Sequence, residues 1–180
     1  MIMSTTHAPR AHKRVLVVED SAAERDLAAR LLSRETDWDL LFAEHGVDAM
    51  SQLEDQDVDL ILTDVHMEPM NGLELFKAVK KSYSHIPVVI MTGVGSEELA
   101  VQVLEQGAAS YVPNVRLRQD LAETASRVLS VASENRAMDE LAARVVRCET
   151  TYELENDLDQ ITACVKRLQR EIEPGTGASR

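Results

Sequence analysis

Five short apolar runs recur along the chain at near-regular intervals, and this spacing limits the fold more than any other feature. Each run has four or five residues, most of them rich in Val, Ile and Leu, and the runs cover 15–18, 40–43, 58–62, 87–91 and 109–112. They do not alternate strictly between apolar and polar residues, which is typical of strands buried on both faces. The sequence therefore predicts five buried strands.

Stretches with helix start and stop residues lie between these runs. Ser21 precedes Glu24 by three positions, and Asn71 precedes Glu74 by the same spacing, so each pair predicts a capping box at a helix start. Five strands that alternate with helices predict an α/β fold with a doubly wound parallel sheet, because right-handed crossovers place helices on both faces. The predicted helices cover 21–33, 46–54, 71–82 and 97–106, the last one capped by Ser96 and ended by Gly107.

The chain changes character after about residue 117. A helix-compatible segment without Gly or Pro runs from 117 to about 147, 149–155 favours a short strand, and 157–172 carries apolar residues at helical spacing. A lone strand and helix cannot bury both of their apolar faces, so they pack on another subunit or the chain is a fragment of a longer protein. We divide the chain into a disordered tail (1–13), the α/β domain (14–130), a helical linker or coiled coil (131–148), a strand and helix that could open a truncated effector (149–173) and a flexible end (174–180).

Charge and composition exclude several classes of function. The chain has 180 residues, with 19 Lys and Arg against 31 Asp and Glu, and its net charge of −12 argues against direct DNA binding and against an anionic membrane surface. The first thirteen residues lack the apolar core of a signal peptide, and no run approaches the ~18 apolar residues of a membrane span. Cys148 and Cys164 form no CxxC pair and are too few to staple the chain. These features predict a cytoplasmic protein.

Acidic residues stand at the ends of two predicted strands. Glu19 and Asp20 follow the first run, and Asp64 follows the third. Ligands of a doubly wound sheet bind beyond the carboxyl ends of the strands, where three converging carboxylates would repel one another unless a cation is present. Oxygen ligands of this kind suit Mg²⁺, which keeps several of its waters. Position alone leaves a second interpretation open, namely that these acids are ordinary polar loop residues.

Five sequence motifs occur in a fixed order at the predicted strand ends. Residues 14 to about 130 thereby resemble the receiver domain of bacterial two-component response regulators. One such motif would be weak, whereas five in the right order and spacing are specific. The motifs are VVED at 17–20, AEHG at 43–46, LTDVHM at 62–67 leading into MNG at 70–72, IMTG at 90–93 and GAASYV at 107–112.

The resemblance implies a fold and a phosphorylation site. The fold would be flavodoxin-like, with a five-stranded parallel sheet in the order 2-1-3-4-5 and an extended C-terminal helix. Asp64 would be the phosphoacceptor, to which a sensor histidine kinase or a phosphotransfer protein transfers a phosphoryl group. Mg²⁺ would be held by Glu19, Asp20, Asp64 and the backbone carbonyl of His66. A metal and oriented donors suit this chemistry, because the transferring phosphoryl group spreads charge over its oxygens.

The resemblance also implies a switch, and the sequence departs from the family pattern near it. Thr92 would donate its hydroxyl to the phosphoryl group, and the aromatic ring of Tyr111 would change rotamer with it. Asn114 stands where the family has a Lys, so a neutral amide replaces a full positive charge, and the cis peptide usual in the family is not expected before Val115. Glu68 stands where the family usually has Pro, which places another carboxylate near the metal site.

Three functions remain to be compared. The first is a phosphorylation-driven signalling module, which is not an enzyme. The second is a receiver-like interaction scaffold that works without phosphorylation, suggested by Asn114. The third, a Mg²⁺-dependent hydrolase that uses Asp64, is disfavoured because no general acid follows Asp64 two residues later and because Thr92 and Tyr111 fit a switch. The strand and helix after about residue 152 also resemble the opening of the serine-kinase type of ATPase domain of anti-sigma factors, although its nucleotide-binding motifs are missing.

The long helix has the apolar spacing of a coiled coil. One set of positions falls seven residues apart, and a second set follows each member by three residues, as the a and d positions of a heptad do. Asn135 occupies an a position, where a buried Asn fixes the register of two strands. We therefore expect a homodimer through residues 117–149. The a positions are Leu121, Val128, Asn135 and Ala142, and the d positions are Thr124, Val131, Met138 and Val145.

Overall fold

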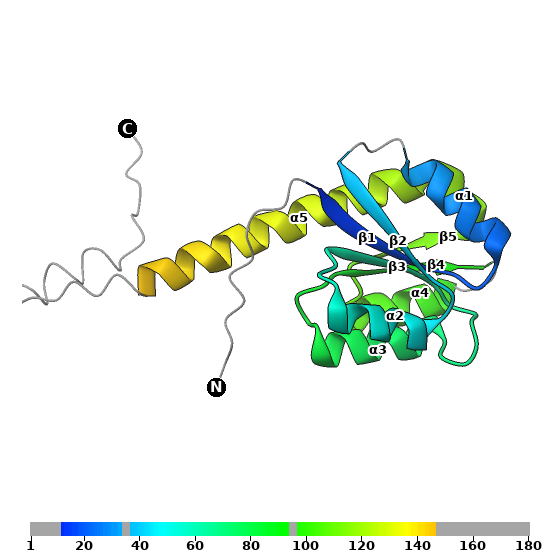
Figure 1. Cartoon of the computed structure of the whole chain (residues 1–180), viewed down its shortest axis with the longest axis horizontal. Helices are drawn as coiled ribbons and strands as arrows, with labels where there is room; N and C mark the ends of the chain where they lie inside the picture. Colours follow the sequence, from blue (N-terminus) through cyan, green and yellow to red (C-terminus); the bar gives the residue numbers. More distant parts are fainter. Residues whose placement is uncertain (1–11, 34–36, 94–96, 147–180) are drawn as a thin grey trace, which may run out of the picture. The chain divides into compact units, whose positions relative to one another are not determined.

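Five parallel strands form one sheet in the order β2-β1-β3-β4-β5 (Figure 1). The computed structural model describes residues 12–33, 37–93 and 97–146. The predicted doubly wound α/β fold and its strand order are confirmed. The strands are β1 (Lys13–Val18), β2 (Trp38–Ala43), β3 (Leu60–Asp64), β4 (Val88–Thr92) and β5 (Ser110–Pro113).

Helices cover both faces of the sheet, so each strand contributes to two cores. Val15 and Val17 pack in the core beneath α1 and the first part of α5, whereas Leu16 and Val18 pack in the core beneath α2 and α3. Successive residues of β1 are therefore all buried, which explains why its sequence does not alternate. The helices are α1 (Ala22–Leu32), α2 (Gly46–Asp55), α3 (Gly72–Ser82), α4 (Glu97–Glu105) and α5 (Leu117–Val146).

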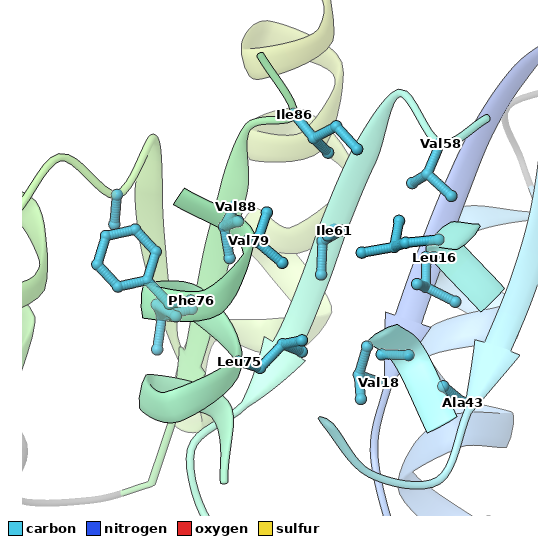
Figure 2. Packing of buried hydrophobic residues seen from close by; sticks show 14 of the residues in the cluster. Leu16, Val18, Ala43, Val58, Ile61, Leu75, Phe76, Val79, Ile86 and Val88 are labelled. Carbon is cyan, nitrogen blue, oxygen red and sulfur yellow. The ribbon is translucent and has the colours of Figure 1, made fainter. Parts of the chain in front are cut away.

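Matching strand positions build the core on the α3 face. Leu16 pairs with Ile61, and Ile61 pairs with Val88, so the three side chains lie in a row across neighbouring strands. Leu75 and Val79 of α3 cover this row (Figure 2). Each of these side chains is at most 3% exposed, and burying one stabilises the fold by roughly 1.5–3 kcal/mol.

The predicted helix caps are confirmed in one case and half formed in the other. At α3, Asn71 Oδ1 accepts from the backbone N–H groups of Leu73 and Glu74, and Glu74 Oε2 accepts from Asn71 N at 3.0 Å. At α1, Ser21 Oγ accepts from Glu24 N at 3.4 Å, but Ser21 N donates to Glu19 Oε1 at 3.1 Å. The prediction that the Glu24 side chain accepts from Ser21 N, which would complete the capping box, is wrong. Ser21 N donates instead to the buried carboxylate of Glu19.

Several predicted elements fall outside the described residues, whereas the ends of α4 and α5 agree with the predicted ones. The cap at Ser96, the strand at 149–155 and the helix at 157–172 belong to the first group. Helix α4 ends before Gly107, whose φ of 92° is the left-handed conformation that glycine adopts without strain. Helix α5 begins at Leu117 and ends at Val146, close to the predicted 117–147. Among the helices of the described ranges, none combines the length and apolar character that crossing a membrane requires.

Candidate functional site

Three strands bring the predicted acids and Thr92 to one edge of the sheet. Asp64 is the last residue of β3, and Thr92 is the last residue of β4. Val18 pairs with Thr63, so Glu19 follows β1 beside Asp64, and Asp64 pairs with Met91 next to Thr92. Parallel pairing therefore gathers residues that are far apart in the sequence at the carboxyl edge, where α/β sheets bind their ligands.

Two of the three acids are buried, and burial changes their acidity. Glu19 is 4% exposed and Asp64 is 7% exposed. Burial, with a smaller contribution from the charge of Asp64, raises the pKa of Glu19 to about 7, although the Ser21 N–H lowers it. Burial also raises the pKa of Asp64, although His66 N donates to its Oδ2 at 2.6 Å and lowers it. Two neighbouring carboxyl groups that resist ionisation form a site that a cation would stabilise.

The donor set fits a hard cation that keeps water ligands. Asp20 is exposed next to the buried pair, and its charge raises the pKa of both Glu19 and Asp64. Within residues 12–33, 37–93 and 97–146, no group of three or more His, Cys, Asp or Glu side chains is arranged to hold a metal by itself. Mg²⁺ does not need such a cage, because it is usually bound by one or two carboxylates and completes its octahedron with waters and other oxygens.

An open cleft of about 790 Å³ adjoins Asp20 and the loop between β3 and α3. His66 and Glu68 are exposed along this loop, and the peptide bond between Glu68 and Pro69 is cis. Of the three acids, Asp20 lines the cleft directly. It is lined by Asp20, Val65, His66, Met67, Glu68, Pro69, Asn71, Leu73 and Glu74.

Gly72 holds the other end of this loop against strand β3. Its N–H donates to the carbonyl of Val65 at 3.1 Å. A Cβ at this position would stand 1.9 Å from the carbonyl oxygen of Asp64. Only glycine allows this approach, so Gly72, the first residue of α3 after the predicted cap at Asn71, also fixes the backbone around Asp64.

The two predicted switch residues lie on adjacent strands. Thr92 is 2% exposed, and Tyr111 is half-buried against the core beneath α2, α3 and α4. Ile90, which precedes Thr92 by two residues in β4, pairs with Tyr111 of β5. The side chains of Thr92 and Tyr111 therefore belong to the same region of the sheet. A displacement of Thr92 would therefore act close to the ring of Tyr111.

Asn114 starts a short helical turn directly after β5. Pro113 pairs with Thr92, so Asn114 lies one residue beyond the sheet at the same edge. It is half-buried, and its carbonyl accepts from Leu117 N. The only cis peptide in the described residues is the one before Pro69, so the bond before Val115 is trans, as expected.

Arg25 is a residue of this site that sequence reasoning missed. Its Nη1 donates to the carbonyl oxygens of Glu19 at 2.6 Å and of Asp20 at 3.1 Å, and its Nη2 donates to Glu44 Oε1 at 3.3 Å. An arginine in an amphipathic helix has no distinctive pattern, and the contact to Glu44 spans 19 residues. Only the structure shows that this side chain contacts the loop that carries the acids.

Comparison with known proteins decides the family. The sequence profile of the response regulator receiver domain matches residues 15–126. The chain belongs to this family. A chemotaxis protein CheY homolog of Campylobacter jejuni is 36% identical over 123 residues, which cover 67% of this chain and 95% of the homolog. The resemblance inferred from the five motifs is confirmed, and with it the assignment to two-component signalling.

Other relatives carry the receiver within longer proteins. The DNA-binding transcriptional regulator NtrC of Proteus hauseri is 36% identical over 99 residues, which cover 55% of this chain and 21% of NtrC. The crystal structure of NtrX from Brucella abortus in complex with ADP is 25% identical, with a TM-score of 0.67, and the match covers 87% of this chain and 34% of that one. The receiver domain of the same NtrX alone is 30% identical, with a TM-score of 0.61, and covers 64% of this chain and 98% of that domain.

Proposed function

We propose that this receiver is a phosphoacceptor signalling module in which Asp64 takes a phosphoryl group from a histidine kinase or a phosphotransfer protein. The observation that supports this most directly is the burial of Asp64 beside Glu19, directly before the loop that lines an open cleft together with Asp20. A carboxylate oxygen of Asp64 attacks phosphorus, the bond to the donor nitrogen breaks, and its electron pair remains on the departing imidazole. The product is an acyl phosphate on Asp64.

The residues around Asp64 have distinct roles in this proposal. Mg²⁺ held by Glu19, Asp20, Asp64 and the carbonyl of His66 would neutralise charge on the transferring phosphoryl group. The N–H of His66 orients the Asp64 carboxylate through its bond to Oδ2. The buried hydroxyl of Thr92 donates to a phosphoryl oxygen and moves its loop, and Tyr111 repacks in response. Asn114 supplies a neutral donor at the position where the family has Lys.

Phosphorylation on Asp64 is tested by intact mass. We expect incubation with Mg²⁺ and a small phosphodonor such as acetyl phosphate to add one phosphoryl group, because the donor can enter the open cleft. The Asp64→Asn variant should gain no mass, since an amide cannot form the acyl phosphate, while Asp26→Asn, an exposed acid on α1, should react like the wild type. An adduct on Asp64→Asn would contradict the assignment.

The phosphorylation-independent scaffold remains the second candidate, and Asn114 is the observation that favours it. A charge-assisted hydrogen bond contributes roughly 1.5–3 kcal/mol and a neutral one about 1 kcal/mol, so replacing Lys weakens the hold on the phosphoryl group. If this loss is partial, Asn114→Lys should speed phosphorylation about tenfold in the same mass assay. Absence of an adduct in both proteins, with small donors and with kinases, would support the scaffold instead.

The output of the module is proposed to pass through α5. The receivers of NtrC and of NtrX belong to longer proteins, so receivers of this family occur together with further segments. The acidic balance of this chain opposes direct DNA binding, and we propose instead a homodimer through α5. Whether residues 149–173 open an ATPase-like effector stays a prediction.

A further inference from the structure

A side chain from the second turn of α1 holds the backbone of the acidic loop. Arg25 Nη1 reaches both carbonyl oxygens of that loop, those of Glu19 at 2.6 Å and of Asp20 at 3.1 Å. The Arg25 side chain is 20% exposed, and its charge-assisted bond to Glu19 is partly buried, whereas the bond to Asp20 is exposed. The main chain of both acids is therefore tied to α1.

The Arg25 guanidinium also contacts a third residue, Glu44, in addition to Glu19 and Asp20. Its Nη2 pairs with Glu44 at 3.3 Å, directly after β2, and Glu19 N donates to the carbonyl of Ala43 at 3.0 Å. The planar fork of an arginine presents its donors in a rigid arrangement, whereas a lysine offers one compact charge. Arg25 thus joins the loop after β1 to the loop after β2.

Backbone position in this loop determines where the acids point. Ser21 N donates to Glu19 Oε1 at 3.1 Å, so a shift of the main chain at residues 19–21 would move the Glu19 carboxylate as well. We propose that Arg25 is a positioning residue of the cation site, which keeps the carboxylates of Glu19 and Asp20 directed toward Asp64. This inference rests on the proposed function, in which these acids hold Mg²⁺.

Calorimetric titration with Mg²⁺ alone tests the inference on the full chain. In Arg25→Ala we expect the dissociation constant for Mg²⁺ to rise about tenfold or more, which is the usual cost of removing a group that orients metal ligands. Arg25→Lys should show a smaller rise than Arg25→Ala. Its ammonium group keeps the positive charge, but it cannot reach all three oxygens. Arg30→Ala removes the same charge from an exposed position of α1 and should bind like the wild type.

A second measurement separates positioning from a general loss of stability. The rate of phosphorylation by a small donor should need about tenfold more Mg²⁺ for half its maximum in Arg25→Ala, with the maximum unchanged. A lower melting temperature with wild-type Mg²⁺ affinity would overturn the inference. If Arg25→Ala fails to fold by circular dichroism, Arg25→Lys decides, and a wild-type constant there would overturn it. A wild-type protein that binds no Mg²⁺ would instead contradict the proposed function, before any variant is compared.

Discussion

Single buried acids at the carboxyl edge of the sheet reduce the stability of the protein. Glu19 and Asp64 are buried side by side, and the charge of Asp64 disfavours the ionised form of Glu19. The pKa of Glu19 in the folded protein is about 7, above its ordinary value of 4.5. The folded state therefore binds more protons than the unfolded state between these values, so the contribution of Glu19 to stability is present below pH 4.5 and is lost as the pH rises through 7.

Replacing Glu19 with Gln should therefore stabilise the metal-free protein at pH 8, by roughly 1–3 kcal/mol. Gln keeps an oxygen that can accept the N–H of Ser21, but it carries no charge. Thermal unfolding in EDTA measures the effect, which should shrink as the pH falls below 7 and vanish below pH 4.5, where Glu19 is protonated in both the folded and the unfolded protein. Saturating Mg²⁺ should narrow or reverse this difference, because the wild type, which keeps all three carboxylates, gains more binding energy than the variant. A Gln variant less stable than the wild type at pH 8 without metal would contradict this account.

The acids could be predicted from the sequence, whereas the residues that support them could not. Glu19, Asp20 and Asp64 directly follow or end apolar runs, and parallel pairing brings such strand ends together. Arg25 acts through main-chain oxygens, and no spacing rule foresees such contacts. Ser21 shows the opposite error, since its pattern predicts a capping box but the nearby Glu19 carboxylate competes for its N–H.

Helix α5 shows at the scale of an element what local patterns predict and what they omit. Its length follows from thirty residues without Gly or Pro. Its main polar contact does not, because Asp59 and Arg136 lie 77 positions apart in the sequence. Asp59, 5% exposed, precedes β3 and accepts from Arg136 Nη1 at 2.7 Å and from Arg14 N at 3.0 Å. The ion pair between Asp59 and Arg136 therefore holds the part of α5 that follows Val131 close to the start of β3.

Removing this ion pair should destabilise the protein in a pH-dependent way. Burial alone would raise the pKa of Asp59, but the Arg14 N–H and Arg136 hold it below 3.8. The stabilisation is therefore present above pH 3.8 and is lost as the pH falls through the lower folded value. We expect Arg136→Ala to cost about 1–3 kcal/mol at pH 7 and less below pH 3.5, measured by urea unfolding.

The exposed Arg118 on the same helix offers a matched control. Arg118→Ala should leave the free energy of unfolding within about 0.5 kcal/mol of the wild type at both pH values. Equal stability of Arg136→Ala and the wild type at pH 7 would show that the ion pair contributes nothing measurable.

At the scale of the whole molecule, the heptad pattern along α5 serves two purposes. Its first part lies inside the receiver, where Leu121, Thr124 and Val128 are each at most 8% exposed and face the sheet. These residues cannot also contact a second copy, so the dimer contact expected over 117–149 can involve only the part of the heptad pattern that follows Val128. Val131 and Met138, 51% and 68% exposed, continue the pattern with the exposed Asn135 between them. Amphipathic spacing alone does not distinguish a face that packs on the sheet from one that is left open.

The open part of the pattern predicts a dimer that a single charge should break. Val131, Asn135 and Met138 have d, a and d spacing, so in a parallel pair Asn135 would hydrogen-bond its twin and set the register. Met138→Glu would place two like charges in this apolar seam, and light scattering at tens of micromolar should then report a monomer where the wild type is a dimer. Ala137→Glu adds the same charge one residue away, at an exposed position outside the seam, and should remain dimeric. Because neither side chain is buried in the receiver, circular dichroism should show all three proteins folded. A monomeric wild type would therefore count against the dimer itself, and a dimeric Met138→Glu would show that the copies meet elsewhere.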